Sequence, residues 1–382
     1  MKAKAGKIYF VGAGPGDPEL ITLKGLKALQ SAQVIVYDRL SHPSLLLEAN
    51  RKATFIYCGK QPCQHTLRQH DIQKELVIQA KKGKTVVRLK GGDPAVFGRV
   101  GEEAEAVSKH HIPYEIVPGI TAGSAAAIYT GVPLTHREHS RSFAIVTGHS
   151  KSRDGKPEIE WEKLAKGVDT IVFYMGVKNL SYIANELVKH GKPEQTSTLV
   201  TEWGTYGRQR SITAPLNKIA AKVKERGMQN PAVIVVGDVT KLHDSLQWVE
   251  QKPLTGYGII GMSDDVDMKA HMHALKEEGA DVYVLGTTDL SHSGREAVWR
   301  LLEEGHTAHV LLHGHTSAQI VMNWIKEFQI EIDRVPSFIC AGKEAEAVMH
   351  GHGYVPSIVL PPFADTSMFM ESLLDEPIRN IV

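Results

Sequence analysis

Short β-branched segments alternate with helix-length segments along the chain, and this alternation constrains the fold more than any other feature of the sequence. In the first 250 residues, strand-like segments occur at 7–11, 34–37, 85–89, 114–117, 143–147, 170–174, 197–200 and 232–236. Helix-length segments such as 22–32, 71–82 and 101–110 separate them. Strands that alternate with helices form a mostly parallel sheet with helices on its faces. The sequence therefore predicts an α/β protein.

Two breaks divide the pattern. Pro133 and the polar stretch 135–141 indicate a break that gives two lobes, about 1–120 and 121–250. A second breaker cluster, 252–256, follows a charged stretch. Strands then recur at 258–261, 282–285, 309–312, 337–341 and 357–360, with helices at 266–278, 294–304, 318–328, 343–350 and 367–374. We expect a smaller doubly wound α/β domain over residues 256–382.

The charge balance excludes several classes of protein. Lys plus Arg number 44 and Asp plus Glu number 43, so the net charge is +1. A near-neutral chain has no general attraction for nucleic acid or anionic membrane, and a polyanionic ligand must be held by a local cluster of cations. No apolar run reaches the roughly 18 residues of a membrane span. Three cysteines are too few for a disulfide framework, so we expect free thiols and a cytoplasmic protein.

A glycine-rich loop follows the first strand and allows two interpretations. Gly12, Gly14 and Gly16 would let backbone N–H groups approach a ligand, and Asp38 ends the second strand. A glycine loop after the first strand with an acid after the second is typical of nucleotide sites. However, the spacing lacks the third glycine of the dinucleotide motif, and Pro15 removes one backbone donor. Alone, this loop does not establish a cofactor site.

Six motifs in order carry a resemblance that is far more specific. They are 12–25 (GAGPGDPELITLKG), 37–40 (YDRL), 86–99 (VVRLKGGDPAVFGR), 117–122 (VPGITA), 133–137 (PLTHR) and 173–176 (FYMG). From about residue 6 to residue 248 the chain resembles the tetrapyrrole methylases. The resemblance implies two α/β lobes with S-adenosylmethionine in the cleft between them and S-adenosylhomocysteine as the product. It also implies that the first glycine loop belongs to the active site and is not a Rossmann phosphate cradle.

The resemblance assigns roles to individual residues. The implied cofactor positions are Pro15, Gly91, Gly92, Asp93, Val96, Thr121, Ala122, Met175, Gly204 and Ala232, and no metal is implied. Asp38 takes the role of general base and Lys60 that of proton donor. A carboxylate such as Asp93 can accept hydrogen bonds from ribose hydroxyls. Arg39, Arg99 and Arg137 lie inside the motifs and are the implied partners of substrate carboxylates.

Within the family, the motif set favours methylation of uroporphyrinogen III at C2 and C7, giving precorrin-2 through precorrin-1. The product would feed sirohaem or cobalamin synthesis. A homodimer is implied by the resemblance alone. The alternatives are a later precorrin methyltransferase, which shares the fold, or a tetrapyrrole-binding regulatory protein.

The segment 256–382 resembles part of uroporphyrinogen-III synthase, but only about half of that enzyme's length is present. We expect a non-catalytic remnant that assists assembly or substrate transfer. Several His-x-His pairs lie here. On a strand, His313 and His315 would share a face and could both approach a metal, whereas His271 and His273 on a helix would diverge. Surface histidines are the favoured interpretation, because metal sites need three or four converging ligands.

Overall fold

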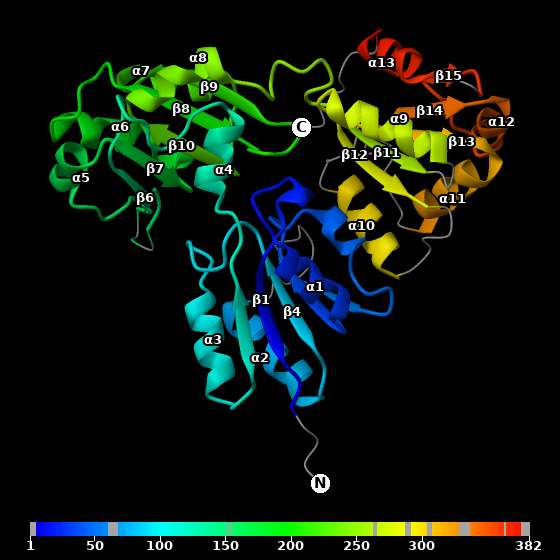
Figure 1. Cartoon of the computed structure of the whole chain (residues 1–382), viewed down its shortest axis with the longest axis horizontal. Coiled ribbons are helices and arrows are strands. Elements are labelled where there is room, and N and C mark those ends of the chain that lie inside the picture. The colour runs from blue at the N-terminus through cyan, green and yellow to red at the C-terminus, as the bar shows by residue number, and fades with distance from the viewer. Residues whose placement is uncertain are drawn as a thin grey trace.

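The described residues form three five-stranded sheets, each with its own helices, in a computed structural model of the chain (Figure 1). The structure describes residues 5–59, 68–150, 152, 154–262, 266–286, 292–303, 308–327, 337–362 and 364–375. We call the three parts lobe 1, lobe 2 and the C-terminal domain. In Figure 1 lobe 1 lies below, with lobe 2 and the C-terminal domain above it on either side.

Lobe 1 is a parallel sheet with helices on both faces. Its strands are β1 (Ile8–Gly12), β2 (Val34–Tyr37), β3 (Thr54–Tyr57), β4 (Val86–Lys90) and β5 (Tyr114–Val117), in the order β3-β2-β4-β1-β5. The helices are α1 (Leu23–Ser31), α2 (Gln69–Lys81) and α3 (Val100–Ser108), with short 3-10 turns η1 (Pro18–Leu20) and η2 (Pro43–Leu46). The side chain of Thr22 caps α1 by accepting from the Gly25 N–H. The parallel strands bring the loops after β1, β2, β4 and β5 to one edge.

Lobe 2 has a mixed sheet. Its strands are β6 (Phe143–Thr147), β7 (Thr170–Tyr174), β8 (Ser197–Glu202), β9 (Arg210–Pro215) and β10 (Ala232–Val236), in the order β6-β7-β10-β8-β9. β6 and β7 pair in parallel, and the other pairs are antiparallel. Around the sheet lie α4 (Ala122–Tyr129), α5 (Trp161–Gly167), η3 (Val177–Asn179), α6 (Leu180–Lys189), α7 (Leu216–Glu225), η4 (Asp238–Leu242) and α8 (His243–Leu246). Helix α4 packs on the face opposite to α5, α6 and α7.

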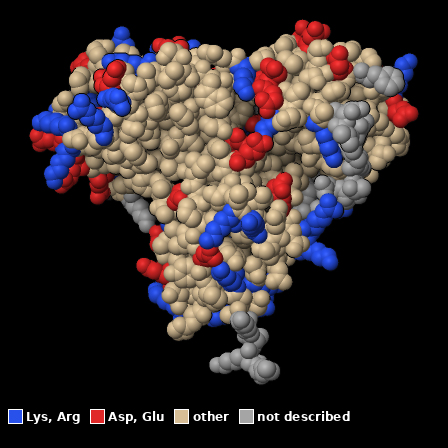
Figure 2. Space-filling model, in the orientation of Figure 1, with Lys and Arg blue, Asp and Glu red and all other residues tan. Residues whose placement is uncertain are grey.

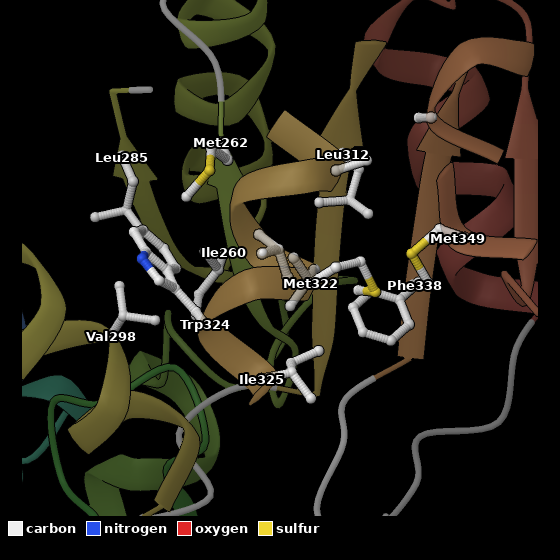
Figure 3. Close-up of a cluster of buried hydrophobic side chains, with 14 of the residues drawn as sticks. Ile260, Met262, Leu285, Val298, Leu312, Met322, Trp324, Ile325, Phe338 and Met349 are labelled. Carbon is white, nitrogen blue, oxygen red and sulfur yellow. The ribbon is translucent and has the colours of Figure 1, made fainter. Parts of the chain in front are cut away.

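The C-terminal domain is doubly wound. Its parallel strands are β11 (Gly258–Met262), β12 (Asp281–Leu285), β13 (His309–His313), β14 (Ser337–Ala341) and β15 (Ile358–Leu360), in the order β12-β11-β13-β14-β15. Helices α9 (Val266–Glu277) and α13 (Thr366–Asp375) pack on one face. Helices α10 (His292–Glu303), α11 (Gly314–Glu327) and α12 (Lys343–Gly351) pack on the other. Figure 3 shows the second core, in which Trp324 lies among Leu285, Val298 and Ile260.

The predicted α/β class is confirmed, but three predictions about the strands were wrong. Lobe 2 is not mostly parallel, because β8, β9 and β10 are joined by antiparallel pairing. Strands β3 and β9 were not predicted; both are edge strands, which bury little and carry a weak hydrophobic signal. Finally, His313 ends β13 whereas His315 already lies in α11, so the two do not share a strand face.

The distribution of charge on the surface agrees with the near-neutral sequence, and the helices agree with its lack of a long apolar run. On the face shown in Figure 2, basic and acidic residues are interspersed over all three parts and form no stripe of one sign. Among the described residues, no helix has the length and apolar character needed to cross a membrane.

Candidate active site

Three loops at the edge of the lobe 1 sheet meet backbone to backbone, and glycine makes this contact possible. A Cβ atom on Gly12 would lie 2.6 Å from the Cα of Gly119, and one on Gly119 would lie 2.3 Å from the carbonyl oxygen of Gly92. Gly14 and Gly92 form an isolated antiparallel bridge, with Gly92 N–H donating to the Gly14 carbonyl at 2.6 Å. The loops after β1, β4 and β5 therefore form one continuous backbone surface.

The same surface extends to the loop after β2 and to lobe 2. A Cβ on Gly91 would lie 2.7 Å from the Cβ of Leu40, and one on Gly16 would lie 2.4 Å from the ring of Tyr206. In lobe 2, Gly204 packs against Ala126 of α4, where an added Cβ would lie 2.3 Å away. The contact between Gly16 and Tyr206 joins the two lobes, next to the predicted cofactor positions Pro15 and Gly204.

Asp93 links the glycine turn at 91–92 to the loop after β5 through a hydrogen bond. Its Oδ1 accepts from the Ala95 N–H at 2.7 Å, and its Oδ2 accepts from the Gly119 N–H at 3.0 Å. Each carboxylate oxygen has a second lone pair, so Asp93 can still accept a hydrogen bond from a ligand hydroxyl. Val96 follows in the same turn, where its N–H donates to the Asp93 carbonyl at 3.3 Å.

The space in front of Gly92 is open. Gly92 has a φ of +67°, and an added Cβ would meet only the Ala122 nitrogen at 3.7 Å and the Ile120 carbonyl oxygen at 4.0 Å. Space next to the main chain at Gly92, close to the start of α4, suits a ligand that is held near the backbone.

Lobe 2 contributes a tyrosine and a strained residue. The Tyr174 hydroxyl lies 2.5 Å from both the Thr121 Oγ1 and the Gly123 nitrogen, so it links the end of β7 to the start of α4. Burial raises the pKa of Tyr174, which keeps the hydroxyl protonated. Met175 follows with a φ of +56° and is 46% exposed.

Backbone strain gathers around this cleft. Apart from His111, the non-glycine residues with positive φ in the described chain are Phe97, Arg99, Met175, Trp203 and Thr205. They lie in the loops after β4, β7 and β8. Such strain persists only where the surroundings impose it, and it is concentrated at functional sites.

Asp38, the predicted base, lies at the end of β2 and is partly exposed. Its Oδ2 accepts from Arg88 Nη2 at 3.2 Å, and its Oδ1 accepts from the Leu40 N–H at 3.2 Å. The Asp38 side chain is 27% exposed whereas that of Arg88 is 4% exposed. Arg88 therefore orients a carboxylate that solvent or a ligand can still reach.

A buried ion cluster lies behind Asp38. Lys90 Nζ lies 3.1 and 3.2 Å from the two carboxylate oxygens of the fully buried Glu103, and Gln69 also donates to Glu103 at 2.9 Å. Burial lowers the pKa of Lys90. Burial acts most strongly on Arg88 and would lower its pKa, but the neighbouring acidic groups, Asp38 and Glu103 among them, together outweigh burial, and the pKa is raised. Arg88 and Lys90 thus support the site from inside.

Cys58 is free and buried beside this cluster, and its thiol donates to the Tyr37 carbonyl at 3.0 Å. Burial raises its pKa to about 11, so the thiol is unreactive at neutral pH. Cys340 is likewise free and buried. Lys60, the predicted proton donor, and Cys63 lie outside the described residues.

The three predicted substrate arginines are exposed but differ in their contacts. Arg39 lies over the ring of Trp203, 5.9 Å from its centroid, and so connects the lobes. Arg99 pairs with Glu102 through Nε at 2.9 Å and Nη2 at 2.5 Å. Arg137 forms no hydrogen bond or ion pair within the described parts of the chain. It lies on a hairpin closed by His136 and Ser140.

Three potential ligand groups also lie on this hairpin. One ligand atom from each of His136, Glu138 and His139 lies within 4.8 Å of the others. The two imidazole rings stack, with centroids 4.8 Å apart. Among the described residues, this is the one group of three that satisfies such a distance, and it differs from the histidine pairs considered in the C-terminal domain.

The remaining predicted positions lie at the same cleft. Pro15 is half-buried between Gly14 and Gly16 of the first loop, and Ala232 begins β10 opposite Glu202. The Trp203 N–H donates to the Pro231 carbonyl at 3.0 Å, which places the Gly204 turn beside Ala232. Sequence reasoning missed Tyr174 and Trp203 as structural partners of the site. Tyr174 lies within the motif at 173–176, whereas no motif in the sequence indicated Trp203.

Comparisons with known proteins agree with this geometry. Uroporphyrinogen-III C-methyltransferase of Bacillus subtilis (strain 168) is 51% identical over 282 residues, which are 74% of this chain and 58% of that protein. The protein of that name from Priestia megaterium is 58% identical over 235 residues, 61% of this chain and 98% of that protein. Siroheme synthase of Stutzerimonas stutzeri is 44% identical over 251 residues, 66% of this chain and 54% of that protein. The chain therefore spans little more than half of two of these relatives.

A solved structure agrees as well. Uroporphyrin-III C-methyl transferase from Thermus thermophilus, complexed with S-adenyl homocysteine, is 38% identical. The match covers 62% of this chain and all of that chain, with a TM-score of 0.54. The family described as Tetrapyrrole (Corrin/Porphyrin) Methylases matches residues 7–220, more than half of the sequence. With its two α/β lobes and the close glycine contacts between the loops of lobe 1, the chain belongs to the tetrapyrrole methylase family.

Proposed function

We propose that this chain transfers methyl groups from S-adenosylmethionine to C2 and C7 of uroporphyrinogen III, giving precorrin-2 through precorrin-1. The observation that carries the proposal is the backbone contact of Gly12, Gly92 and Gly119 beside the partly exposed carboxylate of Asp38. Relatives named for this activity, at 51% and 58% identity, support the choice of substrate.

The methyl donor is S-adenosylmethionine, which supplies an electrophilic methyl group on a sulfonium. The open space at Gly92 fits such a ligand, because glycine and backbone groups can hold a cation without attacking it. The residues that would hold it are Pro15, Gly91, Gly92, Asp93, Val96, Thr121, Ala122, Met175, Gly204 and Ala232. Asp93 would accept hydrogen bonds from the ribose, and Tyr174 would keep Thr121 and the start of α4 in place. Most of the rate enhancement then comes from orientation of the two reactants.

Asp38 is the proposed general base. A pyrrole carbon that gains a methyl group leaves a cationic ring that must lose a proton, and a positioned carboxylate can accept it. Arg88 and the Leu40 N–H hold the Asp38 carboxylate in one orientation from behind. Lys60 is proposed as the proton donor on the strength of the resemblance.

Cations at the mouth of the cleft would receive the substrate. Uroporphyrinogen III carries eight carboxylates, and Arg39, Arg99 and Arg137 are the proposed partners. Arginine suits this role because its guanidinium group can bind a carboxylate through two parallel hydrogen bonds. Arg99 would exchange its ion pair with Glu102 for a substrate carboxylate, whereas Arg137 needs to break no pair.

A sirohaem route is favoured over cobalamin, because siroheme synthases are among the relatives. A homodimer in the cytoplasm is proposed on the resemblance alone. The second candidate function is a later precorrin methyltransferase, which would use the same cleft. A regulatory tetrapyrrole-binding protein is the third, and the presence of Asp38, Lys60 and the Gly91–Asp93 turn in the sequence argues against it.

An anaerobic assay with uroporphyrinogen III and methyl-labelled S-adenosylmethionine tests the proposal on the full chain. We expect two labelled methyl groups per macrocycle. Label that appears only when a later precorrin is offered would establish the second candidate instead. Tight binding of uroporphyrinogen III without label in the product would establish the regulatory one.

A further inference from the structure

The C-terminal domain completes the core of lobe 1. Ala297 of α10 is fully buried within the cluster that contains Tyr37, Leu45 and Leu46 of lobe 1. In return, Leu47, which follows η2, packs against the core of the C-terminal domain. Figure 1 shows α10 between the two sheets. This domain is therefore docked through a shared apolar core rather than tethered by a linker.

A buried arginine lies at the centre of this contact. Arg300 of α10 is 3% exposed, and its guanidinium carbon lies 3.6 Å from the ring centroid of Tyr57. Its Nε donates to the Tyr37 hydroxyl at 3.1 Å. A guanidinium group is almost never buried without specific partners, because its desolvation is costly. Stacking on the Tyr57 ring, a contact with the Trp299 ring at 4.2 Å and the directed hydrogen bond to Tyr37 help to give Arg300 a defined geometry.

The two tyrosines end the strands that lead into the active site. Tyr37 and Tyr57 are paired in register at the last positions of β2 and β3, and their rings lie 5.3 Å apart. Asp38 follows Tyr37 directly, and the chain after Tyr57 leads through Gly59 to Lys60. An added Cβ on Gly59 would lie 2.3 Å from the Tyr57 hydroxyl, so the tyrosine also packs on this exit.

Strand β3 needs such support. It has four residues, lies at the edge of the sheet and pairs within the sheet with β2 alone. A short edge strand with one partner is held weakly by its own hydrogen bonds. Arg300 contacts the last side chain of each of the two strands. It thereby fixes the ends of β2 and β3 relative to each other, and with them Asp38, which follows β2 directly.

A second junction joins the C-terminal domain to both lobes. The ring of the buried His42 stacks on Tyr283 of β12, with centroids 5.4 Å apart, and lies 5.1 Å from that of Tyr206. The Tyr283 hydroxyl lies 3.3 Å from His42 Nε2. Tyr206 belongs to the lobe 2 loop that carries Gly204. The C-terminal domain therefore touches the cleft-forming segments of each lobe.

We propose that Arg300 of the C-terminal domain is a positioning residue for methyl transfer. It acts through Tyr37 on Asp38, which follows directly, while its contact with Tyr57 holds the end of the neighbouring strand β3. This inference rests on the proposed function. It assigns to the C-terminal domain a role in the working geometry of the methyltransferase, without chemistry of its own. No residue of that domain needs to touch the substrate.

A double-mutant cycle tests the proposal on the full chain. R300Q removes the charge and the planar guanidinium group that stacks on Tyr57. Y37F removes only the hydroxyl that Arg300 binds, and the third variant combines the two substitutions. We expect R300Q to lower kcat by about tenfold, because small displacements of reacting groups are costly. The affinity for S-adenosylhomocysteine should change by less than about twofold, since the Gly91–Asp93 turn does not contact Arg300. Because Y37F and R300Q break the same contact, their effects should be less than additive.

Two further variants separate positioning from general stability. R300K keeps a cation above Tyr57 but lacks the Nε donor, so it should restore part of the lost kcat. R295Q alters a half-buried arginine of the same helix, which pairs with Glu327 at 3.0 Å, and should leave kcat unchanged. Y37F keeps the test valid where R300Q fails to fold, because it deletes a single oxygen atom.

The outcomes are distinct. A wild-type chain that transfers no methyl group to uroporphyrinogen III defeats the proposed function. A wild-type chain that is active while R300Q and Y37F match it in kcat defeats the positioning role alone. Strictly additive effects of R300Q and Y37F, or equal losses in R300Q and R295Q, would also overturn it.

Discussion

Lobe 1 and the C-terminal domain both rest on five parallel strands, but the carboxyl edges of their sheets differ. In lobe 1, glycines bring the loops after β1, β4 and β5 into backbone contact beside a free carboxylate face of Asp38. In the C-terminal domain, β13 passes directly into α11 at Gly314, where an added Cβ would meet nothing within 4 Å. A parallel sheet supplies an edge at which ligands can bind. Close loop contact through glycine is what turns that edge into a cleft.

The C-terminal domain contacts the two lobes through other parts of its surface than the carboxyl edge of its sheet. Its side chains reach lobes 1 and 2 through α10 and through β12, away from the carboxyl ends of its strands. Arg300 meets Tyr37, and Tyr283 meets His42. In lobe 1 the carboxyl ends of the strands lie at the proposed ligand site, whereas the C-terminal domain contacts its neighbours through α10 and β12.

The largest effect should come from Asp38, the polar residue that follows β2 in lobe 1. Lys343, which lies beyond the carboxyl end of β14, serves as the control. Asp38→Asn keeps the shape of the side chain but removes the proton acceptor, so turnover should fall by roughly 10²–10⁴-fold. The affinity for S-adenosylhomocysteine, measured by calorimetry, should hardly change, since Asp38 does not belong to the Gly91–Asp93 turn. Lys343→Gln, at the exposed position after β14, should leave turnover unchanged.

Two results would break this part of the comparison. An equal loss of cofactor affinity in Asp38→Asn would assign Asp38 to the cofactor and not to proton transfer. A loss of turnover in Lys343→Gln would show that the C-terminal edge takes part in chemistry.

A smaller effect should follow from adding one methyl group to a glycine in each sheet. In Gly119→Ala the new Cβ would lie 2.3 Å from a backbone oxygen of Gly92, which cannot move without opening the cleft. We expect cofactor affinity and turnover to fall by about 10–100-fold, equivalent to the 1–3 kcal/mol of an overpacked site. In Gly261→Ala of β11 the new Cβ meets the end of the Met272 side chain, which can adapt.

Gly261→Ala should therefore keep full turnover, with a stability loss of about 1 kcal/mol in a denaturant titration. If the two variants lose turnover to the same extent, glycine contact would not be what distinguishes the two edges.

The sequence allowed much of the fold to be predicted, for reasons that particular elements make clear. Strands β2, β5, β6, β7, β10 and β14 have the predicted bounds because each is a short β-branched run between turn residues. Strands β3 and β9 escaped prediction although β5 and β6, which are also edge strands, did not. Strand β9 begins with Arg210 and ends at Pro215, so its residue types do not indicate a strand. The antiparallel pairing in lobe 2 also escaped, since pairing direction depends on connections that periodicity does not encode.

The residues of the site also divide into those that the sequence indicated and those that it did not. Motif residues such as Gly92 and Asp38 were predicted because the chemistry restricts the residue type at each position. Arg300 was not, because a lone arginine in a helix carries no signal of burial. Its role depends on two tyrosines more than 240 residues away in sequence, and only the fold brings them together.

The last prediction concerns stability and not turnover: it applies to the junction between β12 and lobe 2, and it depends on pH. Asp281 begins β12, and the Cβ position of Gly207 lies 2.7 Å from its carboxyl carbon. Burial raises the pKa of Asp281 to about 6, from an ordinary value of 3.8. Because the folded-state pKa lies above the unfolded one, the ionised carboxylate destabilises the fold, and this penalty is present in full above pH 6. It is relieved as the pH falls from 6 to 4.

Asp281→Asn removes the charge and should therefore stabilise the chain at pH 7.5, by on the order of 2 kcal/mol. Near pH 4.5 the gain should be much smaller, because wild-type Asp281 is then largely protonated in the folded protein. Thermal unfolding of both chains at the two pH values measures the difference. A gain that is equal at both would mean that Asp281 acts by packing alone. A gain confined to pH 7.5 would show that the C-terminal domain tolerates a buried charge at the junction through which it meets lobe 2.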